Sequence, residues 1–592
     1  MAGCRGAAVP ADGVARRVAA AQGRACGALV AGSAASAAVI LAIVPVLLIT
    51  LLIGARGVAA MRTTSDFLVA SRRISPTVNA AAVSGEYLSA ASFLGIAGLV
   101  VKDGVGSLWY AVGFAAGYVA MLALVAAPMR RTGALTVPDF AEARLGSPGL
   151  RKLSAVVVLV IGCLYLVPQF TAAGQVLGVV SGSPYWVGVV IAGAAVSITL
   201  ALGGMRAATY VQAFQFVLKL ALFIVPAIWL VLQVSPDTRR DALTPVEFSR
   251  FESATPVQFR LDTTLTLTEP TPVRVGGGAP EVLAPGEYPV EAGQTWEFDA
   301  GAAVPHVGAG PPGGPDWARP LLDPAGHPVL ATWSVLVATV LGTMGLPHIL
   351  IRFHTSPDGR GARRTAAITV ALLGVFYLFP AVYGLLGAAL LPELYLSGGT
   401  DTVVVALPAR VDDGFAGTLF TALLTAGAFA AFLATSLGLL LAVSGALSHD
   451  LVPSTLRRLR FTPLVAALVV VLLALPAARL DVGVLVTSAF AVAASTFCPL
   501  LVLGIWWPRL TARGAIVGMT TGLLASAGVI GIDLFLGVPP GLAGILLGQP
   551  ALWSVPLAFA TMVLVSLRGR PPAWAAAAML RLHLDETEPG RR

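Results

Sequence analysis

The stretch NAAAVSGEYLSAASFLGIAGLV, residues 79–100, is apolar and long enough to cross a lipid bilayer, yet it carries the carboxylate of Glu86. A membrane-spanning helix needs about 20 apolar residues. Gly85, beside the carboxylate, weakens a helix because glycine loses the most conformational freedom when it is ordered. Non-helical backbone is tolerated at membrane depth only where it lines a cavity or is buried in protein. The stretch therefore predicts a broken transmembrane helix next to an internal site.

The rest of the 592-residue chain has the same apolar character, with 57% hydrophobic residues, 11% charged residues and a mean hydropathy of +0.84. This composition excludes a soluble globular protein. It predicts one all-α polytopic membrane protein, embedded in the lipid bilayer of the plasma membrane. The net charge of +8 does not indicate a nucleic-acid partner, because we place the Lys and Arg residues in short loops, where they orient the spans.

About 13 transmembrane helices are predicted from the apolar runs. They lie near residues 35–55, 77–100, 107–129, 153–173, 185–204, 208–234, 331–351, 366–392, 415–445, 462–479, 484–507, 513–536 and 550–568. Loops rich in Lys and Arg alternate with loops nearly free of them. By the positive-inside rule, the N-terminus is predicted outside and the C-terminus inside.

The other segments follow from this count. Residues 1–34 are predicted to be an N-terminal extension or leader, and residues 569–592 a cytoplasmic tail. Residues 35–234 hold the first six spans and residues 331–568 the other seven. Residues 235–330 form an extracytoplasmic loop, in which alternating residues broken by Pro and Gly predict short antiparallel strands.

Three spans carry signs of interruption. The second is the opening stretch, and the seventh has Gly342, Gly345 and Pro347 close together. Proline lacks an N–H and clashes with the preceding turn. The ninth, residues 415–445, is very rich in small residues and hydroxyls. Interrupted spans at corresponding places in two halves indicate a transporter with inverted repeats, here in residues 77–234 and 331–507.

Four segments resemble the solute:sodium symporter family, in its branch of cation/acetate and related monocarboxylate symporters. They are SDFLVASRRISPTVNAAAVSGEYLSAASFLGIAGL (65–99), GTMGLPHILIRFHTSPDGRGAR (342–363), SGALSHDL (444–451) and WPRLTARGAIVGM (507–519). The resemblance implies a leucine-transporter-like fold of five-plus-five inverted repeats. It also implies symport of acetate, or a related short-chain monocarboxylate, by alternating access. Na⁺ or H⁺ would be the coupling ion, with no other cofactor.

In this family a sodium ion lies between the broken second span and the ninth span. The resemblance places its ligands at the carbonyls of Gly85 and Leu88 and at Ala431, Ala434 and Thr435. Position 434 is Ala where sodium-dependent relatives have Ser or Thr, so one expected hydroxyl is absent.

Glu86 has three open roles at this point. An ionisable residue at membrane depth indicates function by default. Glu86 supplies charge or structure to the cation site, or carries a coupling proton, or faces an inner vestibule and pairs with an Arg.

A small carboxylate substrate needs hydrogen-bond donors at the midplane, from half-helix N-termini and neutral side chains. The candidates are Tyr87, Ser89, Gln169, Thr343 and His348, with Tyr165 and Gln175 as weaker ones. No Lys or Arg is assigned a place deep in a span, so no positive side chain is expected at the site centre.

Charged residues are also expected near the inner surface. Arg352 is placed at the inner end of the seventh span, and Asp450 near Arg457 and Arg458. A solvated loop pair and an inner gate are both open interpretations for Asp450.

Other functions are considered on the same residues. A symporter of the same family for proline, pantothenate or a sugar is the alternative within the class. A transporter-like sensor would need a soluble signalling module after the last span, where only a short tail is expected. A membrane enzyme would need a catalytic constellation, and the spans offer one Glu and one His five helices apart. The protein is therefore predicted not to be an enzyme.

Overall fold

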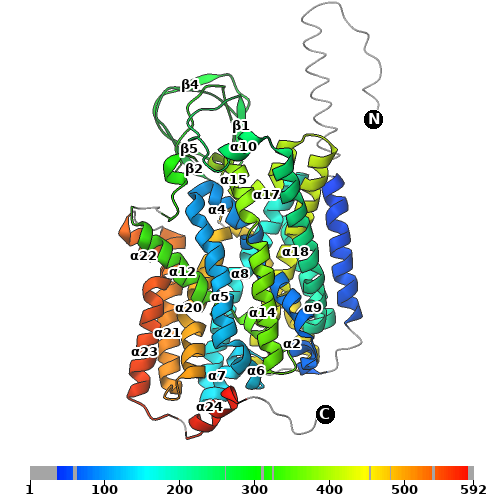
Figure 1. Ribbon diagram of the computed structural model, residues 1–592, viewed down its shortest axis with the longest axis vertical. Helices are drawn as coiled ribbons and strands as arrows, with labels where there is room; N and C mark the ends of the chain where they lie inside the picture. The colour runs from blue at the N-terminus through cyan, green and yellow to red at the C-terminus, as the bar shows by residue number, and fades with distance from the viewer. Residues whose placement is uncertain are drawn as a thin grey trace, which may run out of the picture.

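The computed structural model describes residues 37–584, apart from 58–62, 260–261, 308–312, 323–325, 453–454, 481, 537–540 and 572. The predicted extension, residues 1–34, lies outside the described residues. The helices form a bundle with the strands at one end, and α7 (Val137–Leu145) and α24 (Ala575–His583) lie at the other (Figure 1).

The first half of the bundle starts with the helix Ala37–Arg56, which is followed by short elements and long helices. They are α2 (Thr64–Val69), η2 (Ala70–Arg72), α3 (Pro76–Tyr87), η3 (Ala91–Gly95), α4 (Ile96–Asp103), η4 (Val105–Leu108), α5 (Trp109–Leu124), α6 (Ala126–Arg131), α7, α8 (Pro148–Ser181), α9 (Tyr185–Gln233) and α10 (Pro236–Asp241).

The second half repeats this mixture of short and long helices. They are α11 (Gly314–Trp317), α12 (Pro328–Gly345), α13 (Pro347–Phe353), α14 (Gly359–Phe376), α15 (Pro380–Leu390), α16 (Leu394–Ser397), η5 (Thr400–Thr402), α17 (Val403–Val411), α18 (Phe415–Gly445), η6 (Ala446–Leu451), α19 (Leu456–Ala474), η7 (Pro476–Arg479), α20 (Val482–Trp506), α21 (Ala512–Leu536), α22 (Leu542–Gly548), α23 (Ala551–Leu567) and α24.

Among the described residues, nine helices are long and apolar enough to cross a membrane, or up to 11 when each bent pair counts as one span. The fifth and sixth predicted spans join in the 49-residue helix α9, which is kinked at Gly204, where φ is 53°. The predicted count of about 13 and the sides on which the termini lie stay predictions.

Two of the three predicted interruptions are present. The second span bends by 67° between α3 and the helical stretch Ala91–Asp103. The seventh is interrupted between α12 and α13 at Leu346, whose backbone is extended, and Pro347 starts the next helix. Since proline has no N–H to donate, it fits the first turn of a helix and not its interior.

The predicted interruption of the ninth span is wrong. That span is α18, a continuous helix of 31 residues that ends in a single π-helical turn, η6. Residues 424–445 are all buried, because α18 packs between α9 and α8. The small side chains of this helix therefore allow close helix packing and do not mark a break.

The segment between the two halves contains six short strands at one end of the bundle (Figure 1). They are β1 (Thr255–Gln258), β2 (Thr263–Leu267), β3 (Thr271–Val275), β4 (Glu281–Leu283), β5 (Gly286–Val290) and β6 (Thr295–Phe298). A four-stranded antiparallel sheet has the order β1-β6-β3-β4, and β2 pairs with β5. The segment has its own apolar core, which also includes Tyr395 and Leu396 of α16.

Two tryptophans tie this segment to the bundle. The indole N–H of Trp109, the first residue of α5, donates to the Pro320 carbonyl at 2.8 Å. The indole N–H of Trp317 donates to the Val101 carbonyl of α4 at 3.4 Å. The segment is therefore attached to α4, the second part of the first broken span, and to the start of α5.

Candidate functional site

The break after α3 leaves backbone carbonyls without their helical donors. In an unbroken helix the N–H of Ser89 would donate to the Gly85 carbonyl, but it donates to the Tyr87 carbonyl at 2.8 Å. The ammonium of Lys219, on α9, donates instead to the Gly85 carbonyl and to the Leu88 carbonyl, the second at 2.9 Å. Lys219 is 0% exposed. The two carbonyls predicted to bind sodium are thus both bound to a lysine.

Gly85 explains how α9 comes this close. A Cβ at Gly85 would lie 2.3 Å from the Gln212 carbonyl of α9, so only glycine fits the contact. Lys219 lies seven residues after Gln212, on the same face of the helix. The glycine that weakens the span therefore also lets a neighbouring helix place its lysine at the break.

The expectation that no positive side chain lies at the centre is wrong. Lys219 and Arg352 are both fully buried. Lys219 is visible in the apolar run FVLKLALF, residues 216–223, and an ionisable residue in a span is a signal for function. The assignment of all Lys and Arg residues to loops hid this signal.

Glu86 forms a buried ion pair with Arg352, which lies on α13 and not at the inner surface. The Arg352 Nε donates to the Glu86 carboxylate at 2.6 Å, and both side chains are 0% exposed. Arg352 also donates to Thr209 Oγ1 at 2.8 Å and to Gln212 Oε1. Of the three roles open for Glu86, the pairing with an Arg is present, but in the protein interior and not in a vestibule.

Glycine also makes room for the Glu86 side chain. A Cβ at Gly438, on α18, would lie 1.6 Å from Glu86 Oε1. The carboxylate is held between this glycine and Arg352, so it links three elements: α3, α13 and α18.

The predicted cation ligands on α18 have other partners. The Thr435 hydroxyl donates to the Glu86 carbonyl at 2.5 Å, and the Ala434 carbonyl accepts from Gln212 Nε2 at 2.6 Å. Ala431 is buried in the same helix. The structure therefore brings Gly85 and Leu88 together at Lys219, and Thr435 next to the backbone of Glu86.

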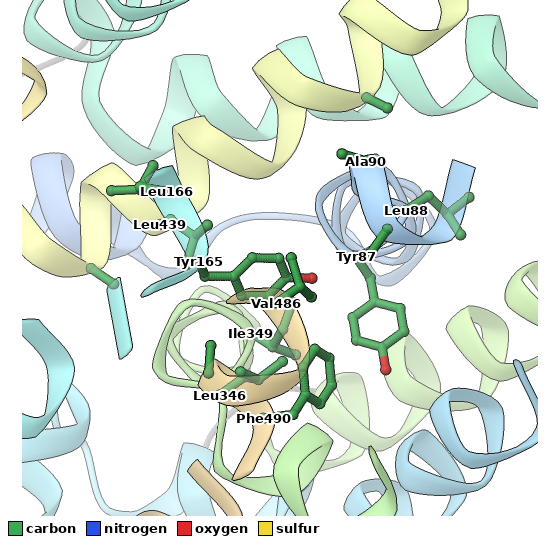
Figure 2. Close-up of a cluster of buried hydrophobic side chains, with 14 of the residues drawn as sticks. Tyr87, Leu88, Ala90, Tyr165, Leu166, Leu346, Ile349, Leu439, Val486 and Phe490 are labelled. Carbon is green, nitrogen blue, oxygen red and sulfur yellow. The ribbon is translucent and has the colours of Figure 1, made fainter. Parts of the chain in front are cut away.

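The predicted substrate-binding residues gather around the two breaks. The Tyr87 hydroxyl lies 2.7 Å from Thr343 Oγ1, linking α3 to α12. The Tyr165 hydroxyl donates to Ser89 Oγ at 3.2 Å, and Gln169 Oε1 accepts from the Ala90 N–H at 3.1 Å. Figure 2 shows Tyr87 and Tyr165 around this cluster, with Phe490 beside them.

Two of these residues keep unused polar atoms. Gln169 Nε2 and both ring nitrogens of His348 are buried without a hydrogen-bond partner among the described residues. The His348 ring packs edge-on against the Tyr165 ring, with centroids 5.4 Å apart. Gln175, in contrast, donates to the Ala478 carbonyl at 3.2 Å, away from the breaks. The structure thus separates Gln175 from the other candidates.

Sequence reasoning missed the aromatic side chains that surround this cluster. Tyr87 makes edge-on contacts with Phe114, Tyr118 and Phe490, at centroid distances of 5.9, 4.6 and 6.4 Å. Tyr377 lies 3.0 Å from Ser92 through their hydroxyls. The missed residues lie on α5, on α20 and in the turn after α14, and no local motif could have indicated that they meet.

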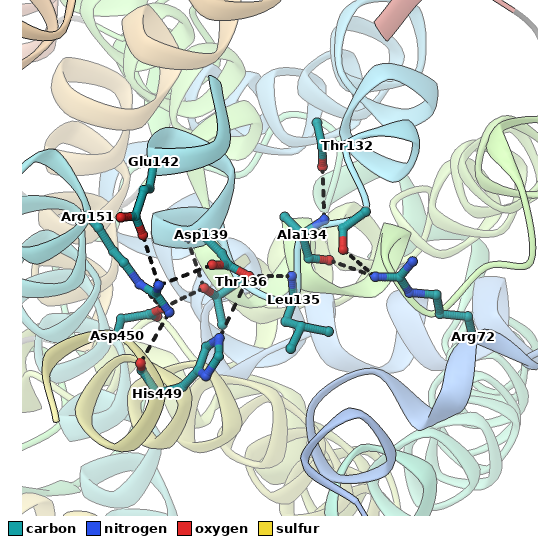
Figure 3. A network of polar contacts seen from close by, with 11 residues as sticks. Arg72, Thr132, Ala134, Leu135, Thr136, Asp139, Glu142, Arg151, His449 and Asp450 are labelled. Carbon is teal, nitrogen blue, oxygen red and sulfur yellow. Dashed lines mark hydrogen bonds and ion pairs between the residues drawn. The ribbon is translucent and has the colours of Figure 1, made fainter. Parts of the chain in front are cut away.

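A second polar network lies at the α7 end of the bundle, where Arg151 of α8 contacts three carboxylates (Figure 3). Its guanidinium lies 3.0 Å from Asp450, 2.9 Å from Glu142 and 3.4 Å from Asp139. His449 lies 3.7 Å from Asp139. Asp450 is therefore buried against Arg151, and its interpretation as a solvated loop pair is wrong. Because Arg151 bridges all three carboxylates, the network is an ion-pair clasp between α7, α8 and η6.

The charges of the clasp affect Asp139 on α7. Burial raises the pKa of Asp139, but the nearby His449 ring, the hydrogen bond from the Leu135 N–H and the Arg151 charge together outweigh burial. The pKa of Asp139 therefore lies below its ordinary value of 3.8, and the carboxylate is ionised at neutral pH.

Two broken spans, buried polar groups at both breaks and a bundle of apolar helices define a class: a multi-pass membrane transporter. A substrate-bound, outward-open structure of a Na⁺-coupled sialic acid symporter has the same fold, with a TM-score of 0.61, 12% identity, and coverage of 90% of this chain and 98% of that chain. The profile of the sodium:solute symporter family matches residues 67–256 and 321–522. An uncharacterized symporter of Bacillus subtilis (strain 168), YwcA, is 30% identical over 529 residues, which are 86% of this chain and 90% of YwcA.

The chain belongs to the sodium:solute symporter family. It is a multi-pass integral membrane protein with the leucine-transporter-like fold, and it is a transporter and not an enzyme. The predicted family, fold class and transport function at the level of a symporter are thereby confirmed.

Proposed function

We propose that this symporter takes up acetate or a related short-chain monocarboxylate, driven by a gradient of Na⁺ or H⁺. The sequence support is the segment GLPHILIRF, residues 345–353, which resembles the monocarboxylate branch. In the structure, this segment contains the second break and contributes His348 and Arg352 to the interior.

The main structural support for the proposal is the charge of the buried side chains next to the two breaks. Glu86 and Arg352 neutralise each other, whereas Lys219 contacts two neutral carbonyls and forms no ion pair with a carboxylate in the part of the chain that the structure describes. With all three groups ionised, Glu86, Arg352 and Lys219 carry a net charge of +1 in a buried place. Buried charges are normally paired, and the carboxylate of a substrate would supply the missing negative charge.

The neutral donors fit the same substrate. Gln169 Nε2 and the His348 ring are buried polar groups that need a partner, because an unmade buried hydrogen bond costs about 1–3 kcal/mol. A monocarboxylate accepts such bonds through its two oxygens. The aromatic rings around Tyr87 supply apolar contacts for a short alkyl group.

The test is uptake of labelled acetate into proteoliposomes, with a Na⁺ gradient and a pH gradient imposed separately. We expect uptake under at least one gradient, and competition by propionate and pyruvate but not by proline, pantothenate or glucose. Gln169→Leu is expected to reduce uptake roughly tenfold, the effect of about 1.4 kcal/mol of lost interaction. Gln175→Leu, which removes the same kind of group outside the cluster, is the matched control.

Uptake of proline, pantothenate or a sugar with no competition by acetate would overturn the substrate class and favour the alternative within the family. Binding of a solute without uptake under any gradient would favour a transporter-like sensor. Sialic acid, the substrate of the similar symporter, belongs in the competition panel because it also presents a carboxylate.

A further inference from the structure

We propose that Lys219 is a built-in cation that replaces sodium at the break of the first repeat, so that Na⁺ does not bind between the Gly85 and Leu88 carbonyls. The inference takes from the proposed function only the place where a coupling cation would bind. It does not depend on which solute is carried. It restricts the proposed coupling: an ion gradient drives uptake, but not through a sodium ion bound to the Gly85 and Leu88 carbonyls.

The first observation is the occupancy of the carbonyls. The ammonium of Lys219 donates to both the Gly85 and the Leu88 carbonyl and is wholly buried. An ammonium and a sodium ion have the same charge and both seek oxygen atoms. They would repel each other strongly in a buried place of low polarity, so the two cations exclude one another.

The second observation concerns the facing helix. A sodium site needs several oxygen ligands, and position 434 offers no hydroxyl because it is Ala. The Ala434 carbonyl accepts from Gln212, and the Thr435 hydroxyl donates to the Glu86 backbone. Two of the predicted ligands on α18, the Ala434 carbonyl and the Thr435 hydroxyl, therefore already have protein partners, which is what a site without sodium permits.

The third observation is the choice of side chain. Apart from Lys219, the chain contains two lysines, Lys102 and Lys152, and it uses arginine at all its other Lys or Arg positions. Arginine is a wide planar fork, whereas the lysine ammonium is a compact point charge on a flexible stem. A lysine therefore imitates a sodium ion between two converging carbonyls better than an arginine would.

The charged groups that face Lys219 are consistent with this role. Glu86 on α3 is the carboxylate that acts on the Lys219 charge, and Arg352 on α13 is bound to that carboxylate. Arg352 pairs with Glu86 through Oε2, and Lys219 is hydrogen-bonded to the two carbonyls and not to this carboxylate.

The experiment measures sodium binding directly, without substrate or transport. Purified wild-type protein in detergent is unfolded thermally in NaCl and in choline chloride, and the midpoints are compared over a range of Na⁺ concentrations. A bound ligand raises the midpoint in proportion to the logarithm of its concentration. For the wild type we expect the same midpoint in both salts.

Lys219→Ala frees the carbonyls, and the double variant Lys219→Ala/Ala434→Ser adds the missing hydroxyl. We expect Na⁺ to raise the midpoint of the double variant by roughly 2 °C or more, with a smaller rise for the single variant. Lys152→Ala removes an exposed lysine outside the site and is the control, with no sodium effect expected.

A sodium-dependent rise in the wild type that disappears in Thr435→Ala would overturn the inference, because sodium would then bind at the predicted ligands despite Lys219. Absence of any sodium effect in both Lys219 variants would overturn it as well. If neither Lys219 variant folds, the wild type and Thr435→Ala still decide the question, since a sodium effect that depends on Thr435 contradicts the inference and its absence supports it. None of these outcomes depends on acetate, so failure of the substrate proposal is recognised separately.

Discussion

The two broken spans have similar backbones and different charges. At each break a glycine meets a carbonyl of another helix: a Cβ at Gly85 would lie 2.3 Å from the Gln212 carbonyl, and one at Gly345 would lie 2.4 Å from the Ala493 carbonyl. The first break contains Glu86 and is contacted by Lys219 of α9. The second contains the neutral His348, and the helix that follows it contributes Arg352, which pairs with Glu86. The two repeats therefore share the backbone geometry of the break, whereas the side chains at the two breaks differ in charge and in their partners.

The ion pair between the breaks gives the largest expected effect. Arg352→Leu leaves Glu86 buried without its partner, and the loss of one member of a buried pair costs about 3–5 kcal/mol. We expect a large fall in the thermal unfolding midpoint, whereas Arg364→Leu, at an exposed position, changes it little.

The double variant Glu86→Leu/Arg352→Leu sharpens this prediction. It removes both charges, so we expect it to be more stable than Arg352→Leu alone. Equal or lower stability of the double variant would show that the pair matters through packing and not through charge.

The glycine contacts should be alike at both breaks, in spite of the different charges. Gly85→Ala and Gly345→Ala each force a helix away from a backbone carbonyl, which costs about 1–3 kcal/mol. Gly374→Ala, where a Cβ meets no atom within 4 Å, is the control, and we expect it to be neutral or slightly stabilising. Thermal unfolding measures all three, and a large difference between the first two would break the comparison of shapes.

The hydroxyl link between the breaks is expected to have a smaller effect. Thr343→Val removes the partner of the Tyr87 hydroxyl, and a lost neutral hydrogen bond is worth about 0.5–1.5 kcal/mol. We expect acetate uptake to fall by roughly threefold to tenfold. The Thr339 hydroxyl bonds its own helix, so Thr339→Val serves as the control, and equal uptake by the two variants would contradict a role for Thr343 in the site.

The smallest expected effect lies outside the breaks, in the ion-pair clasp around Arg151. The pKa of Asp139 is lower in the folded protein than its ordinary value of 3.8, so its ionised form stabilises the fold at pH values above about 4. This stabilisation is lost as the pH falls through the lowered pKa. We expect Asp139→Asn to lower the unfolding midpoint at pH 7, and the difference from wild type to shrink as the pH falls below about 4. A difference that stays constant down to pH 3 would exclude an effect of the Asp139 charge.

The fold was accessible from the sequence because its signals are local. Apolar runs, Pro347 and Gly85 predict the spans and both breaks without knowledge of what lies opposite. The partners of charged residues were not accessible, because Glu86 and Arg352 are 266 residues apart in the chain. The small residues of α18 misled the prediction, since close packing and helix interruption both select glycine and alanine.

Lys219 shows a different limit. Its presence in an apolar run is a local signal, but its target is a pair of backbone carbonyls, which leave no mark in the sequence. Only the close approach of α9 to Gly85 in the structure shows which carbonyls Lys219 binds.

The Lys219 ammonium is covalently attached to the chain, so its binding to the carbonyls responds to the salt concentration differently from the binding of a free ion. A free ion reaches a site in proportion to its concentration in the bath, whereas a tethered group has a fixed effective concentration of roughly millimolar or more. The carbonyls of Gly85 and Leu88 are therefore supplied with a cation by Lys219 whether the medium is salty or dilute. Occupancy of this position becomes a property of the polypeptide, independent of the salinity on either side of the membrane.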